Sequence, residues 1–227
     1  MVLRRALVAA VALMSGLAAA RVEAQRLPGG VEPVHYSLRM EPDLKTATFS
    51  GSETIEVVLD APASAITLNA AEIQFESAQA YVVPPGVAVG GLNKKGGELP
   101  IDLTALDRLQ VGGSPQTAEV TLDAAKEQAT LHFARPLPAG RVLLAIAFRG
   151  ILSDKLRGFY LSKSKTRSYA VTQFEATDAR RAFPCFDEPA LKATFDVSLI
   201  VDAGDTGISN TKMVSDMPCL LYTSRCV

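Results

Sequence analysis

Alternation of apolar and polar side chains with a period of two residues is the feature that most constrains how this chain can fold. Between Tyr36 and Met40 the apolar residues alternate with Ser37 and Arg39, and the stretch from Phe49 to Leu59 repeats the pattern. Successive side chains of a β-strand point to opposite faces, so this alternation is typical of strands with one buried face. Helical periodicity is nearly absent.

Further short segments of strand character follow, separated by turn residues. The segment 141–150 is almost continuously apolar, which indicates a central strand buried on both faces. We expect one or two helical turns at Asp178–Ala182, with Thr177 or Asp178 as the N-cap and Pro184 ending the helix. The remaining strands are predicted over 65–69, 74–83, 116–123, 128–133, 159–162, 169–174 and 193–201.

These patterns predict a single all-β domain, an antiparallel saddle-like β-sandwich or a stack of curved sheets. The length of 227 residues allows one domain with a real core and is too short for two. The stretch Gly86–Gly113 is rich in glycine and has little periodicity, so we interpret it as an insertion or a long hairpin loop.

The first residues have the pattern of a secretory signal peptide. Arg4 and Arg5 precede an apolar run over residues 6–20, and small residues follow at Ala20 and Ala24. We predict a signal peptide over residues 1–24, with cleavage after Ala20 as the alternative. The protein is then expected to be exported, to the periplasm or outside the cell, and to be membrane-associated if the segment stays uncleaved.

Charge and cysteine content exclude several function classes. The formal net charge is −1 and no basic stripe occurs, so we expect no nucleic-acid binding. The cysteines are Cys185, Cys219 and Cys226, without Cys-x-x-Cys spacing. Cys185 is predicted to be a lone buried thiol. The histidines, His35 and His132, are far apart and are interpreted as ordinary strand residues.

The segment from Val171 to Pro189 is unusually rich in charge. Its simplest interpretation is a solvated loop in which an arginine, 180 or 181, pairs with an acidic residue, 187 or 188. Gln173 and Glu175, however, are two residues apart at a predicted strand end, so their side chains share one face. A carboxylate and an amide oxygen can both accept hydrogen bonds from an ammonium group. That arrangement suits recognition of a peptide's free amino terminus.

The run from Thr172 to Phe195 resembles the corresponding stretch of the aminopeptidase N family of zinc metallopeptidases, the gluzincins. Leucyl-cystinyl and puromycin-sensitive aminopeptidases carry similar versions. The resemblance covers about residues 27–217, in the family's order. Shorter matches are Pro33-Val-His-Tyr36, Phe49-Ser-Gly51, Gly158-Phe-Tyr160 and Ile208-Ser-Asn210.

The resemblance implies roles for particular positions. Gln173 and Glu175 match the residues that hold the α-ammonium group of the substrate, and Glu175 supplies the charge that makes the enzyme an exopeptidase. Phe183-Pro184 is interpreted as fixing the path of the loop. A structural role, through ion pairs and caps, is expected for Asp178, Arg180, Arg181, Asp187 and Glu188.

Other parts of the family pattern are not in this sequence. The Gly-x-Met-Glu-Asn loop, the His-Glu-x-x-His helix and the further zinc ligand are absent, so we expect no catalytic or metal-binding residue here. The resemblance implies zinc in the full-length family and none bound by this fragment, which is predicted to be inactive alone. Its expected partners are peptides with a free amino terminus and the missing catalytic domain.

Two alternatives remain open: a standalone, non-catalytic β-sandwich that binds peptides or proteins, and a scaffold that has lost the zinc motif. In full-length relatives this domain packs against the catalytic one, so an isolated copy would expose apolar surface. A fragment of residues 25–218 is therefore expected to be poorly soluble or oligomeric.

The last nine residues, Cys219–Val227, resemble nothing expected of the family. One permitted back-translation of them, closed by a stop codon, is an inverted repeat about a central CTAG and looks like two transposon-end adapters joined head to head. We predict a domain over residues 25–218 followed by a non-native tail over 219–227. The alternative is a genuine short protein.

Overall fold

The computed structural model describes residues 26–87, 112–218 and 224–226 of the chain. The predicted signal peptide, most of the glycine-rich stretch and part of the predicted tail lie outside these residues. No helix in the described residues is long and apolar enough to cross a membrane.

The structure confirms that the domain is all-β and that each predicted strand exists. The one helical element among the described residues is a single turn of 3-10 helix, η2 (Ala179–Arg181), inside the stretch predicted to be helical. Asp178 occupies its N-cap position, but its side chain makes no capping hydrogen bond. The strands are β1 (Val31–Asp43), β2 (Thr48–Leu59), β3 (Ala63–Asn69), β4 (Gln74–Val82), β5 (Gly112–Asp123), β6 (Gln128–Leu137), β7 (Gly140–Ile151), β8 (Gly158–Lys163), β9 (Ser168–Gln173), β10 (Thr194–Asp202), β11 (Met217–Pro218) and β12 (Ser224–Cys226).

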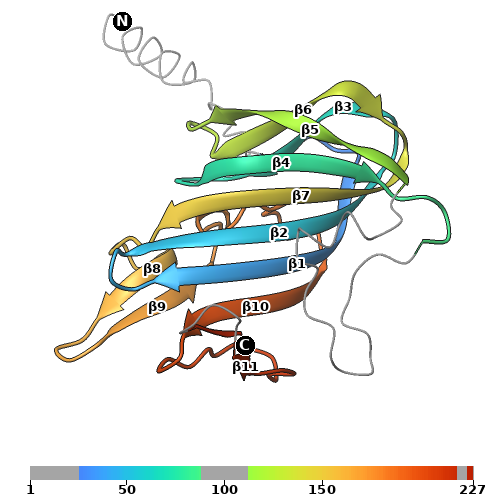
Figure 1. The fold of residues 1–227 in the computed structure, drawn as a ribbon. Helices are drawn as coiled ribbons and strands as arrows, with labels where there is room; N and C mark the ends of the chain where they lie inside the picture. The colour runs from blue at the N-terminus through green and yellow to red at the C-terminus, as the bar shows by residue number, and fades with distance from the viewer. Residues whose placement is uncertain (1–25, 88–111, 219–223, 227) are drawn as a thin grey trace, which may run out of the picture.

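Ten strands form one strongly curved sheet, in the order β11-β12-β10-β1-β2-β7-β4-β5-β6-β3. Figure 1 shows the sheet curling over at its β5-β6-β3 end, while the hairpin β8-β9 projects at the opposite side as a separate two-stranded sheet. The curved-sheet prediction is therefore confirmed.

The expectation of purely antiparallel pairing is wrong at one place. Strand β10 pairs with β1 in parallel, with Tyr36 opposite Phe195. A period-two pattern carries no information on strand direction. No short hairpin constrains this pair either, because β1 and β10 are separated by most of the chain.

The core lies against one face of the central strands. In β7, Val142, Leu144, Ile146 and Phe148 are fully buried on the core face, and Leu143 on the other face is 2% exposed. The prediction that 141–150 is buried on both faces is confirmed for this part of β7. Alternate residues of β2, such as Ile55, face the same core, as the period of two requires.

A second layer covers this core. Phe159 of β8 and the segment that follows η2 belong to the same buried cluster, which includes Phe183, Cys185 and Phe186. The rings of Phe49 and Phe159 lie 5.1 Å apart between centroids. The charged motif is thus fixed on the main sheet by its own apolar residues.

Candidate amino-terminus site and its scaffold

The two predicted site residues lie at the end of strand β9, on the side of the hairpin away from the turn that joins β8 to β9. Gln173 is the last residue of β9 and lies opposite Gly158 of β8. Glu175 lies beyond the strand, in a turn, and its peptide bond to Ala176 is cis. Both side chains are exposed. Strand alternation therefore does not set the direction of Glu175, contrary to the argument from the sequence.

Arg180, close behind this turn, is buried and fully engaged. Its Nε donates to Asp187 Oδ2 at 2.9 Å, and its Nη2 donates to the Asp187 carbonyl at 3.3 Å. Its Nη1 lies 3.4 Å from Glu127 Oε2, at the β5–β6 turn. The predicted pairing of an arginine with Asp187 is therefore confirmed for Arg180.

Arg181 pairs with different carboxylates from those predicted. Its Nε donates to Asp178 Oδ1 at 2.8 Å, its Nη1 donates to Glu72 Oε1 at 3.0 Å, and its Nη2 donates to Glu127 Oε1. Burial by itself lowers the pKa of Arg181, but Asp178, Glu127 and Glu72 raise it, and the net shift is upward. Glu188, the other expected partner, accepts the Leu27 backbone N–H instead.

Close packing joins this anchor to the site strand. Gly158, opposite Gln173, has a φ of +66°, and a Cβ there would lie 2.6 Å from Arg181 Cβ. The Asp178 backbone N–H donates to the Phe174 carbonyl at 2.9 Å, which closes the turn that carries Glu175. The Gln173–Glu175 segment is therefore connected to Arg181 through Gly158 and to Asp178 through the Phe174 carbonyl.

The segment that follows η2 is tied to β1 and β3. The Phe186 N–H donates to Tyr36 Oη at 3.1 Å, and the Asp187 N–H donates to Asn69 Oδ1 at 3.1 Å. Asn69 also exchanges two backbone hydrogen bonds with Cys185. Burial raises the pKa values of Tyr36 and of the Cys185 thiol. Cys185 is free and buried, as predicted.

The chain matches the Peptidase M1 N-terminal domain family over residues 32–218. It is 37% identical to aminopeptidase M1-D of Oryza sativa over 84% of this chain and 19% of the relative. It is 32% identical to the puromycin-sensitive aminopeptidase of Caenorhabditis elegans over 89% of this chain and 19% of the relative. The chain belongs to the Peptidase M1 N-terminal domain family. The resemblance seen in the sequence is confirmed, and the domain spans about one fifth of the length of these relatives.

The prediction that this M1 N-terminal domain is exported is wrong. Its relatives include aminopeptidase 2 of Saccharomyces cerevisiae, which is named as mitochondrial and is 37% identical over 81% of this chain and 17% of the relative. None of these three relatives has a name that places it outside the cell. The prediction used only the sequence pattern of residues 1–24, which lie outside the described residues.

The described residues of the domain do not fit the zinc ion that the resemblance implies. No group of three His, Cys, Asp or Glu side chains that could hold a metal occurs within 26–87, 112–218 and 224–226. His35 instead lies 2.7 Å from Thr194 Oγ1 and 3.2 Å from Asp196 Oδ2, and His132 lies 2.9 Å from Thr121 Oγ1. Both histidines lie in strands, as predicted, and no chemical step is assigned to a metal here.

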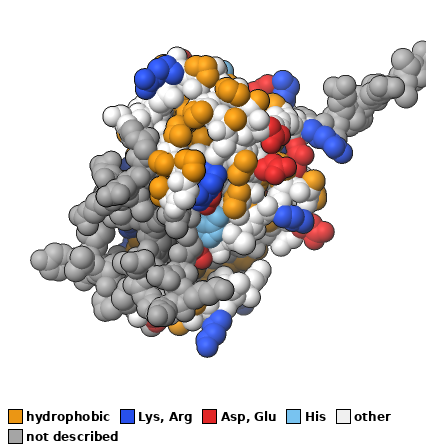
Figure 2. All heavy atoms as spheres, turned by 90° about the vertical axis from the view of Figure 1, so that its right-hand side faces the viewer, with side chains coloured by type: hydrophobic (Ala, Val, Ile, Leu, Met, Phe, Trp, Pro, Cys, Tyr) orange, Lys and Arg blue, Asp and Glu red, His pale blue; other side chains and the backbone are white. Residues whose placement is uncertain are grey.

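The coloured surface drawn in Figure 2 has no region in which charges of one sign predominate. Basic, acidic and hydrophobic side chains are interspersed among the coloured residues of that face. This mixture agrees with the net charge of −1. A long-range electrostatic attraction for nucleic acid has no support on this face.

Sequence reasoning missed the residues that anchor the motif from a distance. Glu72 and Glu127 both sit in tight turns with positive φ, +60° and +52°. The strand pattern predicts that both glutamates lie in turns between strands. It does not predict that both accept hydrogen bonds from Arg181. Glu53 was also missed, although the period of two places it on the core face with Ile55. It is 1% exposed, and neither of its carboxyl oxygens has a hydrogen-bond partner among the residues that the structure describes.

Proposed function

We propose that this chain is the amino-terminal part of a zinc aminopeptidase, in which Gln173 and Glu175 hold the free amino group of a peptide substrate. The relatives are named as aminopeptidases, which supports peptide hydrolysis from the amino terminus in the longer protein. The zinc ion and its ligands would come from the rest of that protein, the catalytic domain.

The observation that carries the proposal is a contrast in hydrogen bonding within one motif. Gln173 and Glu175 are exposed, and no described residue forms a side-chain hydrogen bond or ion pair with either. The residues around them, Asp178, Arg180 and Arg181, are all engaged. An exposed carboxylate on an anchored turn is available for a ligand's ammonium group, and such charge-assisted bonds are among the stronger ones.

The negative charge of Glu175 would also affect catalysis in the longer protein. An α-ammonium group bound to Glu175 would place the first residue of the peptide at a fixed position relative to the catalytic domain. A blocked amino terminus would leave the carboxylate without its partner, so the site would discriminate against it. This domain alone supplies binding groups and would be inactive without its catalytic partner.

The decisive test uses the longer gene product with substitutions at the two positions. Glu175→Gln is expected to raise KM for an aminoacyl anilide about 10- to 100-fold, the loss of one charged hydrogen bond. Gln173→Ala should have a smaller effect of the same kind. Glu119→Gln, an exposed glutamate on β5, is the matched control and should leave KM unchanged.

Two outcomes would contradict the proposal. An active longer protein in which Glu175→Gln behaves like Glu119→Gln would remove the assigned role of the turn. A genuine stop codon after residue 227, with no downstream zinc motif, would leave the non-catalytic binding domain in its place. Genomic sequencing across codon 218 therefore also tests the domain limits of 25–218 and the foreign origin of residues 219–227.

A further inference from the structure

Three buried polar side chains lie between the central strands and the segment that follows η2. Glu53 on β2, Tyr36 on β1 and Asn69 at the end of β3 are 1%, 2% and 0% exposed. The Phe186 N–H donates to Tyr36 Oη, and the Asp187 N–H donates to Asn69 Oδ1. Because they bind neighbouring residues of one segment, Tyr36 and Asn69 lie close together.

The strand register places Glu53 beside Tyr36. Tyr36 lies opposite Ile55 in the β1–β2 pair, and Glu53 is two residues from Ile55, so Glu53 and Tyr36 are diagonal neighbours on the core face. Burial is the main cause that raises the pKa values of Tyr36 and Cys185, and the charge of Glu53 adds to both. Cys185 in turn exchanges backbone hydrogen bonds with Asn69. Glu53, Tyr36 and Asn69 thus form one buried polar cluster.

The hydrogen-bonding groups left over in the buried polar cluster are complementary but do not meet. Among the described residues, neither Glu53 oxygen has a partner, and neither has the Nδ2 of Asn69. Tyr36 Oη is an acceptor in its one hydrogen bond within the described residues, so its O–H proton stays available. Buried polar groups in folded proteins nearly always have a hydrogen-bond partner, and ordered water commonly supplies it.

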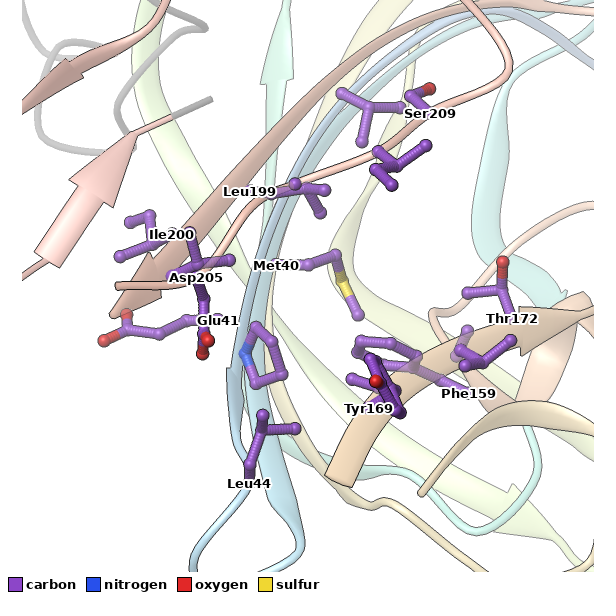
Figure 3. A pocket seen from close by; sticks show the side chains of 18 of the residues that line it. Met40, Glu41, Leu44, Phe159, Tyr169, Thr172, Leu199, Ile200, Asp205 and Ser209 are labelled. Atoms are coloured by element: carbon purple, nitrogen blue, oxygen red, sulfur yellow. The ribbon is translucent and has the colours of Figure 1, made fainter. Parts of the chain in front are cut away.

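The open groove of the domain does not reach the buried polar cluster. Figure 3 shows this groove between the β8-β9 hairpin, with Phe159, and the β1-β10 side of the sheet, with Met40 and Leu199. None of the three cluster residues lines it. Phe195, which does line it, stacks on the Tyr36 ring with 4.5 Å between the centroids. Solvent in the groove therefore does not satisfy the buried groups.

We propose that the buried polar cluster is a binding site for water, in which an ordered molecule links Glu53 to Tyr36 and Asn69. Water accepts from Asn69 Nδ2 and from the Tyr36 hydroxyl while it donates to the Glu53 carboxyl group. A buried water makes about three hydrogen bonds, which this cluster can supply. A metal cation does not suit the cluster, because Asn69 Oδ1 accepts the Asp187 N–H and the amide is left with its N–H donors.

The bound water would connect the central strand β2 to the segment that anchors the charged motif. A crystal structure of the 227-residue chain, or of a longer protein that contains it, tests this without any substitution. We expect density for a water molecule within about 3 Å of a Glu53 carboxyl oxygen and of Asn69 Nδ2. A direct hydrogen bond from Asn69 or Tyr36 to Glu53 would overturn the proposal.

Substitutions test the same site in solution. Relaxation dispersion of water oxygen-17 counts the long-lived water molecules of a protein, and Glu53→Met is expected to lose at least one of those held by the parent chain. Glu53→Gln, which keeps hydrogen-bonding groups, should retain the parent's count. Glu119→Met, at an exposed glutamate of β5, is the matched control and should retain it too. Equal counts in Glu53→Met and the parent would overturn the proposal, and the crystallographic test decides if Glu53→Met does not fold.

A cation at the buried polar cluster is distinguished by its effect on stability. At constant ionic strength, the midpoint of thermal unfolding of the parent chain should be the same in sodium, potassium and tetramethylammonium chloride, because water needs no ion. A midpoint that rises with sodium or potassium in the parent chain, and not in Glu53→Gln, would identify a bound cation and overturn the proposal.

Discussion

The tip and the anchor of the charged motif differ in what surrounds their charges, although they lie within fifteen residues of each other. At the anchor, Arg180 is 5% exposed and donates to Asp187 and Glu127. At the tip, Gln173 and Glu175 are exposed and have no side-chain partner among the described residues. Carboxylates occur at both places, and they differ in their environment: paired and partly buried at the anchor, exposed at the tip.

The difference separates the residues that stabilise the fold from those that are proposed to bind a ligand. A buried arginine must be neutralised by partners, so its loss should cost folding free energy. An exposed carboxylate is already solvated, so its loss should cost little until a ligand arrives. Substitutions that affect only one of these two quantities test the comparison directly.

The largest effect is expected at the anchor. Arg180→Met should lower the free energy of unfolding by about 3–5 kcal/mol, because it leaves Asp187 without its buried partner. Urea denaturation followed by circular dichroism measures this. Arg135→Met, at an exposed arginine of β6, is the control and should change stability by no more than about 0.5 kcal/mol. Equal stability of the two variants would show that the anchor is dispensable.

A smaller loss of stability is expected at Gly158, which lies opposite Gln173 and packs against Arg181. Gly158→Ala places a Cβ 2.6 Å from Arg181 Cβ at a φ of +66°, so we expect a loss of about 1–3 kcal/mol. The control is Gly204→Ala, where an added Cβ meets nothing within 4 Å. That change should be neutral or slightly stabilising. The midpoints of thermal unfolding of the two variants measure this difference in stability. Equal midpoints would contradict the close packing of Gly158 against Arg181.

Much of the fold was predictable from the sequence because strand periodicity is a local signal. Strand β2 and the buried strand β7 follow directly from side-chain patterns within a dozen residues. The parallel pairing of β1 with β10 joins distant segments, and no turn sequence between them predicts it. The place of β10 beside β1 in the sheet therefore could not be predicted from local sequence patterns.

The candidate site divides in the same way. The ion pair of Arg180 with Asp187 joins residues seven apart in one loop, and it was predictable. The bond from Arg181 to Glu72 joins residues 109 positions apart, and it required the folded sheet. The roles of Gln173 and Glu175 came from family resemblance and remain predictions.

Glu53 sharpens the comparison, since it is buried like the anchor and, among the described residues, has no hydrogen-bond partner, like the tip. Burial raises the pKa of Glu53 well above its ordinary value of 4.5. The folded state therefore keeps the proton to higher pH than the unfolded state, so stability falls as pH rises above about 4.5. The fall is at most about 1.4 kcal/mol per pH unit for one proton.

Glu53→Gln removes this dependence, so its stability relative to the parent chain should improve steadily from pH 4.5 to 7. Urea denaturation at several pH values measures the difference between the two proteins. Tyr36 and Cys185, the neighbours whose pKa values burial raises, do not titrate in this range. A difference independent of pH would mean that Glu53 is not the buried acid that the structure shows.

The smallest effect on stability is expected at the tip. Glu175→Ala should change the free energy of unfolding by no more than about 0.5 kcal/mol, because an exposed side chain without a partner contributes little to folding. Asp178→Ala, in the same turn, should cost about 1 kcal/mol through the lost hydrogen bond to Arg181 Nε. Parallel urea titrations of the two variants compare one carboxylate that holds the fold with one that is free to bind. If Glu175→Ala costs as much as Asp178→Ala, Glu175 belongs to the anchor and the recognition role loses its structural support.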